Sequence, residues 1–121
     1  MQRFKILIVE DEYIERQAYK IALELAGYVV CGSVSSGEEA IEQAGFEKPD
    51  IVIMDIALDG EMDGIEAAKH MISSFGIPVI YVTGYWDEDD KMRAGVSKEH
   101  EYLVKPIDTT TLVNAIAAAL G

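Results

Sequence analysis

Three acidic residues stand directly after short apolar runs, where they could act together on a cation. Glu10 and Asp11 follow residues 4–9, which are nearly all apolar, and Asp55 follows the apolar residues 51–54. Carboxylates that are held close together cannot all stay ionised without a compensating charge. Mg²⁺ suits such a site, because it takes one or two carboxylates, a carbonyl oxygen and several waters, and it often also holds a phosphate. These residues therefore predict a magnesium site.

A hydroxyl and an ammonium group extend this set. Thr83 follows the apolar residues 78–82, and Lys105 follows residues 102–104. Together with Asp55 they make a coherent phosphoryl chemistry, in which the aspartate acts as a nucleophile and forms an aspartyl phosphate. Mg²⁺ and Lys105 would neutralise charge on the phosphoryl oxygens, and Thr83 would donate a hydrogen bond to one of them.

The elements that must position these residues follow from the hydrophobic pattern. Five short apolar runs lack the polar alternation of a half-exposed antiparallel sheet, so they are typical of strands buried on both faces. These runs are residues 4–9, 28–34, 51–54, 78–82 and 102–104. Segments of helical period alternate with them, which predicts a doubly wound α/β fold with helices on both faces of a parallel sheet. Such sheets place their sites at the carboxyl ends of the strands.

The helices are predicted from spacing and capping residues. Ile14, Ala18, Ile21, Ala22 and Leu25 repeat at helical spacing before Gly27 ends the first helix. Ser36 and Glu39 have the form of a capping box, and Asp63 and Asp108 also stand at predicted helix starts. The helical spacing of the apolar residues places Phe75 on the inner face of the third helix.

Outside the predicted site, we expect the acids Glu12, Glu61 and residues 87–90 to be solvated.

The composition fits one domain and excludes several classes of protein. The 121 residues are 50% hydrophobic, which rules out a disordered chain, and no apolar run is long enough to cross a membrane. The N-terminus lacks a signal-peptide pattern, so we expect a cytoplasmic protein. A net charge of −12 disfavours nucleic acid and anionic membranes as direct partners. Cys31 is expected to be a small core residue.

The sequence resembles the receiver domains of two-component response regulators over essentially its whole length. Five short motifs carry the resemblance, and their order and their positions at strand ends make it specific. They are Ile6-Leu7-Ile8-Val9-Glu10-Asp11, Ile53-Met54-Asp55, Met62-Asp63-Gly64-Ile65, Val82-Thr83-Gly84 and Tyr102-Leu103-Val104-Lys105-Pro106. The resemblance implies a single receiver domain over residues 1–121. Its flavodoxin-like fold would have five parallel strands in the order 2-1-3-4-5 and five flanking helices.

The resemblance also implies roles for the site residues. Asp55 would be the phosphoacceptor and therefore the modified residue. Glu10 and Asp11 would hold Mg²⁺ directly or through water, and the carbonyl group of Ala57 would be a further ligand. Lys105 would bind the phosphate, and its bond to the following proline would be cis.

Thr83 and Tyr102 match the switch pair of the family. When a phosphoryl group on Asp55 draws the Thr83 hydroxyl inward, the Tyr102 ring can turn into the space that opens. This would change the surface around the fourth helix, fifth strand and fifth helix. Trp86, three residues past Thr83, is expected to be an exposed loop aromatic or a partner contact, in a loop that moves with Thr83.

The implied partners are those of a phosphorelay. A phosphohistidine on a sensor histidine kinase or a phosphotransfer protein would donate the phosphoryl group, and acetyl phosphate could substitute. The chain starts at Met1 and ends at Gly121, directly after the last helix. We therefore expect either a stand-alone receiver that signals to a downstream protein or a receiver whose output domain lies beyond the C-terminus. Homodimerisation of the phosphorylated form stays open.

Two departures from the family pattern bear on the lifetime of the phosphate. The loop after the phosphoacceptor lacks the usual proline and is one residue longer. Ala57 stands two residues past the phosphoacceptor, and Tyr85 stands two past Thr83, where polar side chains position the hydrolytic water in some relatives. We therefore predict a self-phosphorylating domain that loses its phosphate slowly and is not a conventional enzyme. The alternative is that Asp59 or Glu61 supplies the missing polar group.

Three other function classes are weighed against the receiver. A phosphorylation-independent interaction module on the same scaffold usually lacks the acids, the aspartate or the lysine, and all are present here. A flavin-binding electron carrier of similar topology needs a Ser/Thr/Gly-rich phosphate loop after the first strand, where residues 10–12 are acidic. A phosphohydrolase with an aspartyl intermediate usually has an Asp-x-Asp pair, whose second position is occupied here by Ala57.

Overall fold

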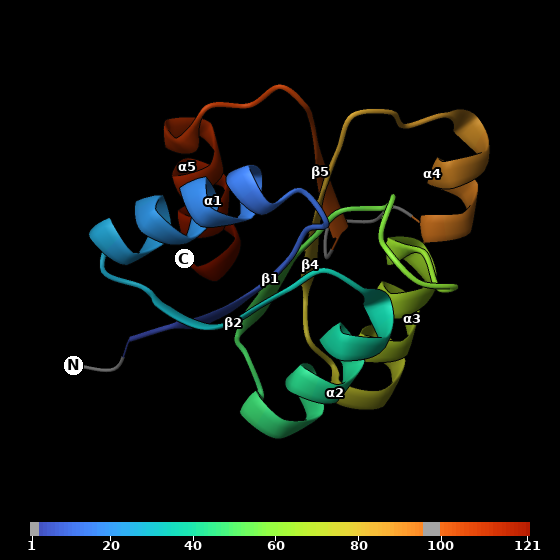
Figure 1. The fold of residues 1–121 in the computed structure, drawn as a ribbon, viewed down its shortest axis with the longest axis horizontal. Coiled ribbons are helices and arrows are strands. Elements are labelled where there is room, and N and C mark those ends of the chain that lie inside the picture. The colour runs from blue at the N-terminus through green and yellow to red at the C-terminus, as the bar shows by residue number, and fades with distance from the viewer. Residues whose placement is uncertain (1–2, 96–99) are drawn as a thin grey trace.

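A computed structural model describes residues 3–95 and 100–121 as strands that alternate with helices (Figure 1). The elements are β1 (Lys5–Val9), α1 (Tyr13–Leu25), β2 (Val29–Val34), α2 (Gly37–Glu47), β3 (Ile51–Met54), α3 (Gly64–Phe75), β4 (Val79–Thr83), α4 (Glu88–Ala94), β5 (His100–Val104) and α5 (Thr109–Leu120). The strands form one parallel sheet in the order β2-β1-β3-β4-β5, which confirms the predicted topology. Within the described ranges, no helix is long and apolar enough to span a bilayer.

The sheet separates two apolar cores. Successive residues of a strand point to opposite faces, so neighbours in sequence enter different cores. α1 and α5 cover one face, over Ile6, Ile8, Ile51, Ile53, Ile80 and Val82. α2 and α3 cover the other face, over Leu7, Val9, Val52, Met54, Val79 and Tyr81 (Figure 1). Cys31, on β2, is partly buried and packs against the second core, as expected.

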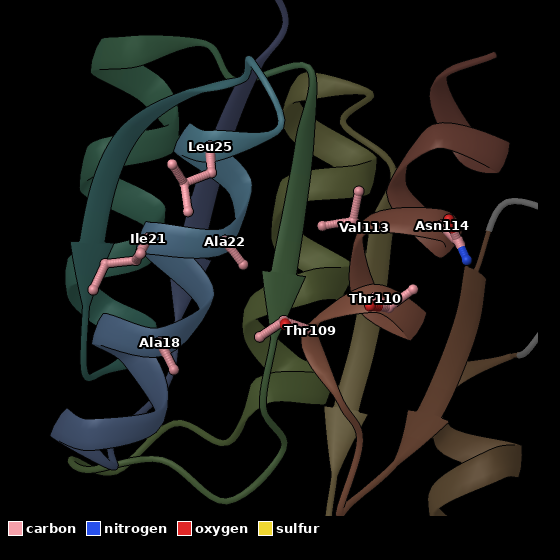
Figure 2. A pocket seen from close by; sticks show the side chains of 8 residues that line it. All are labelled: Ala18, Ile21, Ala22, Leu25, Thr109, Thr110, Val113 and Asn114. Atoms are coloured by element: carbon pink, nitrogen blue, oxygen red, sulfur yellow. The ribbon is translucent and has the colours of Figure 1, made fainter.

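The buried face of α1 differs from the one that its apolar spacing indicates. Tyr19 and Leu23, one turn apart, are buried against the sheet, whereas Ile14, Ile21 and Leu25 are 83%, 57% and 84% exposed. Burial of a tyrosine and a leucine removes a large apolar area from water, which favours this orientation of the helix. Ile21 and Leu25 border an open groove between α1 and the start of α5 (Figure 2). It is lined by Ala18, Ile21, Ala22, Leu25, Thr109, Thr110, Val113 and Asn114.

Most of the predicted helix starts are capped by a side-chain oxygen, which accepts a hydrogen bond from the backbone N–H three residues later. These caps are Ser36, Asp63 and Asp108. At Ser36 the cap is one-sided, because the Glu39 carboxylate accepts from the serine hydroxyl. Asp87 and Asp90, which we expected to be solvated, instead form a reciprocal capping box at the start of α4. Phe75 is 43% exposed rather than inward, because α3 ends there.

Candidate functional site

The register of the sheet places two of the predicted acids side by side. Val9 of β1 pairs with Met54 of β3, so Glu10 and Asp55 leave the sheet at the same level. The backbone N–H of Asp55 donates to the carbonyl oxygen of Val9 over 2.9 Å, which extends the pairing to the site. Both acidic residues are buried, at 1% and 5% exposure. The predicted juxtaposition of these carboxylates is therefore present.

Asp11 completes an acidic cluster at this edge. One carboxylate oxygen from each of Glu10, Asp11 and Asp55 lies within 4.8 Å of the others. The backbone N–H of Ala57 donates to Asp55 Oδ1 over 3.3 Å and holds that oxygen on the loop side. The cluster borders a depression of about 440 Å³ that is lined by Asp11, Glu12, Asp55, Ile56, Ala57, Thr83, Gly84, Tyr85, Asp90 and Lys105. These hard oxygen donors fit the ligand preference of Mg²⁺.

Lys105 brings its ammonium group between three carboxylates. Its Nζ lies 2.6 Å from Glu10 Oε1 and 2.9 Å from Asp55 Oδ2. A third carboxylate oxygen, Glu15 Oε2, lies 2.6 Å away. The Lys105 backbone N–H donates to the carbonyl oxygen of Thr83 over 2.8 Å, and the bond to the following proline is cis, as the resemblance implied. Sequence reasoning missed Glu15, because its approach to Lys105 depends on how α1 is rotated against the sheet.

Burial and charge act in opposite directions on the pKa values of this cluster. Burial raises the pKa of Glu10 to about 8, and the hydrogen bonds from Lys105 and the Glu12 backbone offset this only in part. Burial alone would lower the pKa of Lys105. Its contacts with Glu10, Glu15 and Asp55 outweigh that effect and raise the pKa above the usual lysine value. Lys105 therefore keeps its positive charge at the bottom of an acidic site.

The loop after Asp55 is anchored by a close approach at Gly64. The Gly64 backbone N–H donates to the carbonyl oxygen of Ile56 over 2.8 Å. A Cβ atom added to Gly64 would collide with the backbone carbonyl of Asp55, so only glycine fits. Asp63, which caps α3, also pairs with Arg93 of α4 over 2.6 Å. These contacts hold the longer loop in place and join it to α4.

Comparisons with known proteins agree with this geometry. The family model of the response regulator receiver domain matches residues 6–117. The chain belongs to this receiver family. It is 36% identical to the transcriptional regulatory protein PdtaR of Mycobacterium tuberculosis, over 97% of this chain and 57% of that protein. It is also 35% identical to the protein PilH of Pseudomonas aeruginosa, over 97% of this chain and 98% of that protein.

A solved structure supports the same assignment for this receiver domain. It is the signal receiver domain of a modulated diguanylate cyclase from Desulfovibrio desulfuricans G20, with a TM-score of 0.87 and 34% sequence identity. The alignment covers 98% of this chain and 94% of that one. This chain spans little more than half of PdtaR but nearly all of PilH. Response regulator receivers interact with histidine kinases and with output domains, and these are the two partner classes of the family.

The receiver's predicted switch residues lie on the β4–β5 side of the site. Thr83 is buried, and its hydroxyl donates to the carbonyl oxygen of Tyr85 over 3.2 Å. Tyr102 is 38% exposed, and its ring stacks on Trp86 with a centroid distance of 4.9 Å and an interplanar angle of 21°. Trp86 also contacts Tyr81, at 5.4 Å between centroids. Trp86 is therefore a partly buried link between two rings, and our expectation of an exposed loop aromatic was wrong.

Proposed function

We propose that this receiver domain accepts a phosphoryl group on Asp55. The observation that carries the proposal is the placement of this carboxylate. It is buried at the carboxyl edge of the sheet and borders the depression, and its Oδ2 lies 2.9 Å from the ammonium group of Lys105. A carboxylate in this position is a nucleophile that already has a cation beside it to offset the charge of an incoming phosphoryl group.

The chemical step is an in-line transfer. An oxygen of Asp55 forms a bond to phosphorus while the bond between phosphorus and the donor's imidazole nitrogen breaks, and that nitrogen keeps the electron pair. The Lys105 ammonium and the Thr83 hydroxyl stabilise charge on the phosphoryl oxygens. Glu10, Asp11, Asp55 and the carbonyl of Ala57 would hold Mg²⁺, which supplies further positive charge at those oxygens. The chain itself supplies the nucleophile, the ammonium group and the hydroxyl.

The signal would leave the site through Thr83. Its hydroxyl must give up the carbonyl oxygen of Tyr85 in order to reach a phosphoryl oxygen, so the loop after β4 would rearrange. Trp86 belongs to that loop, and its stacking on Tyr102 would be released at the same time. Tyr102 could then turn inward and alter the surface formed by α4, β5 and α5. Such a switch is a two-state element that a local charge event biases.

The biological setting that we propose is a two-component phosphorelay in the cytoplasm. The donor would be a sensor histidine kinase or a phosphotransfer protein. The recipient of the signal would be a downstream protein or an output domain joined to a single receiver domain of residues 1–121. The high negative charge makes nucleic acid and membranes unsuitable as direct partners. Phosphorylation-dependent dimerisation is a further route by which the altered surface could signal.

Intact-mass spectrometry tests the proposed chemistry directly. The protein is incubated with acetyl phosphate and Mg²⁺, and we expect a covalent gain of one phosphoryl group. A parallel sample with a chelator in place of Mg²⁺ should show little or no gain, since the charge on the phosphoryl oxygens would be poorly offset. An unchanged mass with both acetyl phosphate and a phosphohistidine donor would contradict the proposal and favour a phosphorylation-independent binding module.

A further inference from the structure

The ammonium group of Lys105 is surrounded by three carboxylates before any phosphate arrives. An ammonium group has three N–H donors and no acceptor. Three carboxylate oxygens lie within 2.9 Å of Nζ, one each from Glu10, Glu15 and Asp55. Nζ donates hydrogen bonds to Glu10 Oε1 and Asp55 Oδ2, whereas Glu15 Oε2 is buried beside the ammonium group at ion-pair distance without a hydrogen bond. A phosphoryl oxygen that contacts Lys105 must therefore enter a space around Nζ that these carboxylates already occupy.

The three carboxylates differ in how easily they can withdraw. The side chains of Glu10 and Asp55 are 1% and 6% exposed, whereas that of Glu15 is 42% exposed. Withdrawal of Glu10 would leave a buried carboxyl group without its hydrogen bond from Lys105, which is unfavourable. Its second oxygen is also held by the backbone N–H of Glu12, over 3.0 Å. Asp55 would itself carry the phosphoryl group, so its side chain stays beside Lys105 during the transfer.

Glu15 is the carboxylate that can leave at low cost. It lies on the first turn of α1, its Oε2 is buried beside Lys105 without a hydrogen bond, and the side chain as a whole is 42% exposed. Partly exposed ion pairs contribute little net free energy. We infer that Glu15 is a positioning residue for Lys105. In the unphosphorylated domain, it occupies the place on the ammonium group that a phosphoryl oxygen takes after transfer. This inference rests on the proposed acceptance of a phosphoryl group by Asp55.

The consequence is that Glu15 opposes phosphorylation. A phosphoryl group that enters would displace the Glu15 carboxylate from Lys105, and loss of the phosphoryl group lets the carboxylate return. The exchange breaks and forms ion pairs only, so it needs no co-reactant. Glu15 therefore sets how strongly the site favours its unphosphorylated form.

Glu12 provides a matched control for simple charge repulsion. It carries the same charge, it is exposed, and it lines the same depression as Asp55. Its described contact with the cluster is made by its backbone N–H and not by its carboxylate. Removal of either charge should ease the approach of any anion. Only removal of the Glu15 charge also removes a carboxylate from beside Lys105.

The test uses beryllofluoride, a mimic of the phosphoryl group, at saturating Mg²⁺ and constant ionic strength. Wild type, Glu15→Gln and Glu12→Gln are titrated, and each variant is melted to confirm its fold. We expect Glu15→Gln to bind about fivefold tighter than wild type, and Glu12→Gln to differ by less than about twofold. The Glu15→Gln advantage should persist in roughly 1 M salt, which screens repulsion over longer distances but not the loss of a direct competitor.

The outcomes separate this inference from the proposed function. If Glu15→Gln and Glu12→Gln change the affinity equally, or if the difference disappears in high salt, Glu15 acts only through its charge and the inference is wrong. If wild type binds no beryllofluoride and gains no phosphoryl group from acetyl phosphate, the proposed function itself fails. If the wild-type protein is phosphorylated, the proposed function holds, and the comparison of Glu15→Gln with Glu12→Gln decides the role of Glu15.

Discussion

The carboxyl edge of the sheet has two halves that are held together in different ways. On the β1 and β3 side, Glu10 and Asp55 are buried, aligned by strand register and bonded to Lys105. On the β4 and β5 side, Thr83 donates to a carbonyl of its own loop, and Tyr102 is held by stacking on Trp86. Charged, buried contacts are costly to break, whereas a single neutral hydrogen bond and a half-exposed stack are easily exchanged. A phosphoryl group could therefore rearrange the second half without deforming the first.

The largest effect is expected from removal of the nucleophile on the β1 and β3 side. Asp55→Asn keeps the size of the side chain, so the protein should still fold and melt cooperatively. The amide is a poor nucleophile, so incorporation of phosphate from acetyl phosphate, followed by intact mass, should fall to background. Labelling of the Asn variant at the wild-type level would mean that another acid accepts the phosphoryl group.

A pair of glycine substitutions tests whether the first half is the more rigid. Gly64→Ala forces a Cβ against the carbonyl of Asp55 and should lower the free energy of unfolding by roughly 2–4 kcal/mol in urea titrations. Gly84→Ala, in the loop after β4, meets no atom within 4 Å and should change it by no more than about 0.5 kcal/mol. Equal effects of the two substitutions would remove the contrast between the halves.

The lifetime of the phosphate should depend on one residue from each half of the site, Ala57 after β3 and Tyr85 after β4. Ala57 and Tyr85 line the depression, and neither carries an acid or amide that could orient the hydrolytic water. Ala57→Asn or Tyr85→Glu should therefore speed phosphate loss, on the order of tenfold, because water positioning is much of this catalysis. The rate is followed by intact mass after removal of the donor. Unchanged rates in both variants would make Asp59 and Glu61 the better candidates for that role.

Mg²⁺ should stabilise the first half. Ions that bind the native acids reduce their mutual repulsion, and tenfold excess over Kd would add about 1.4 kcal/mol and raise Tm by several degrees. Asp11→Asn should lose most of this shift, since one of the three carboxylates is gone. Glu61→Gln is the control, because Glu61 is exposed and lies outside the acidic cluster. An identical Tm of wild type with and without millimolar Mg²⁺ would count against the metal site.

The smallest effect is expected in the second half, in the fluorescence of the only tryptophan. Trp86 stacks on Tyr102, so its emission should change modestly on phosphorylation, when the loop after Thr83 rearranges. Thr83→Ala should abolish most of that change, because the hydroxyl that moves the loop is missing. Superimposable spectra of the Mg²⁺-bound and phosphorylated wild type would refute the coupling of this loop to the site.

The strand ends could be predicted from the sequence because parallel strands place their carboxyl ends at the same edge of the sheet. Apolar runs that stop at an acid, a threonine or a lysine therefore indicated Glu10, Asp55, Thr83 and Lys105. Glu15 could not be found in this way, because its contact with Lys105 depends on the rotation of α1 about its own axis. That rotation is chosen by packing and not by apolar spacing alone.

The same limit explains the errors elsewhere in the chain. Ile14, Ile21 and Leu25 form a convincing apolar face in sequence, but the sheet accommodates Tyr19 and Leu23. The partial burial of Trp86 also depends on tertiary structure, because it requires rings from β4 and β5 to lie beside the loop. Local patterns define elements and caps, whereas the choice of which face is covered depends on contacts between segments that are distant in sequence.

Helix α4 is secured chiefly by polar contacts, and this has a consequence for local opening of the native state. Ala94 is the only buried residue of this helix, which is otherwise held by the Asp87–Asp90 capping box and the Asp63–Arg93 ion pair. Ion pairs at a surface weaken as ionic strength rises. The backbone amides of α4 should therefore exchange with solvent through small openings of low free energy, while those of β1 and β3 exchange only on global unfolding. The salt concentration of the cell would thus set how often this helix opens beside the proposed signalling surface.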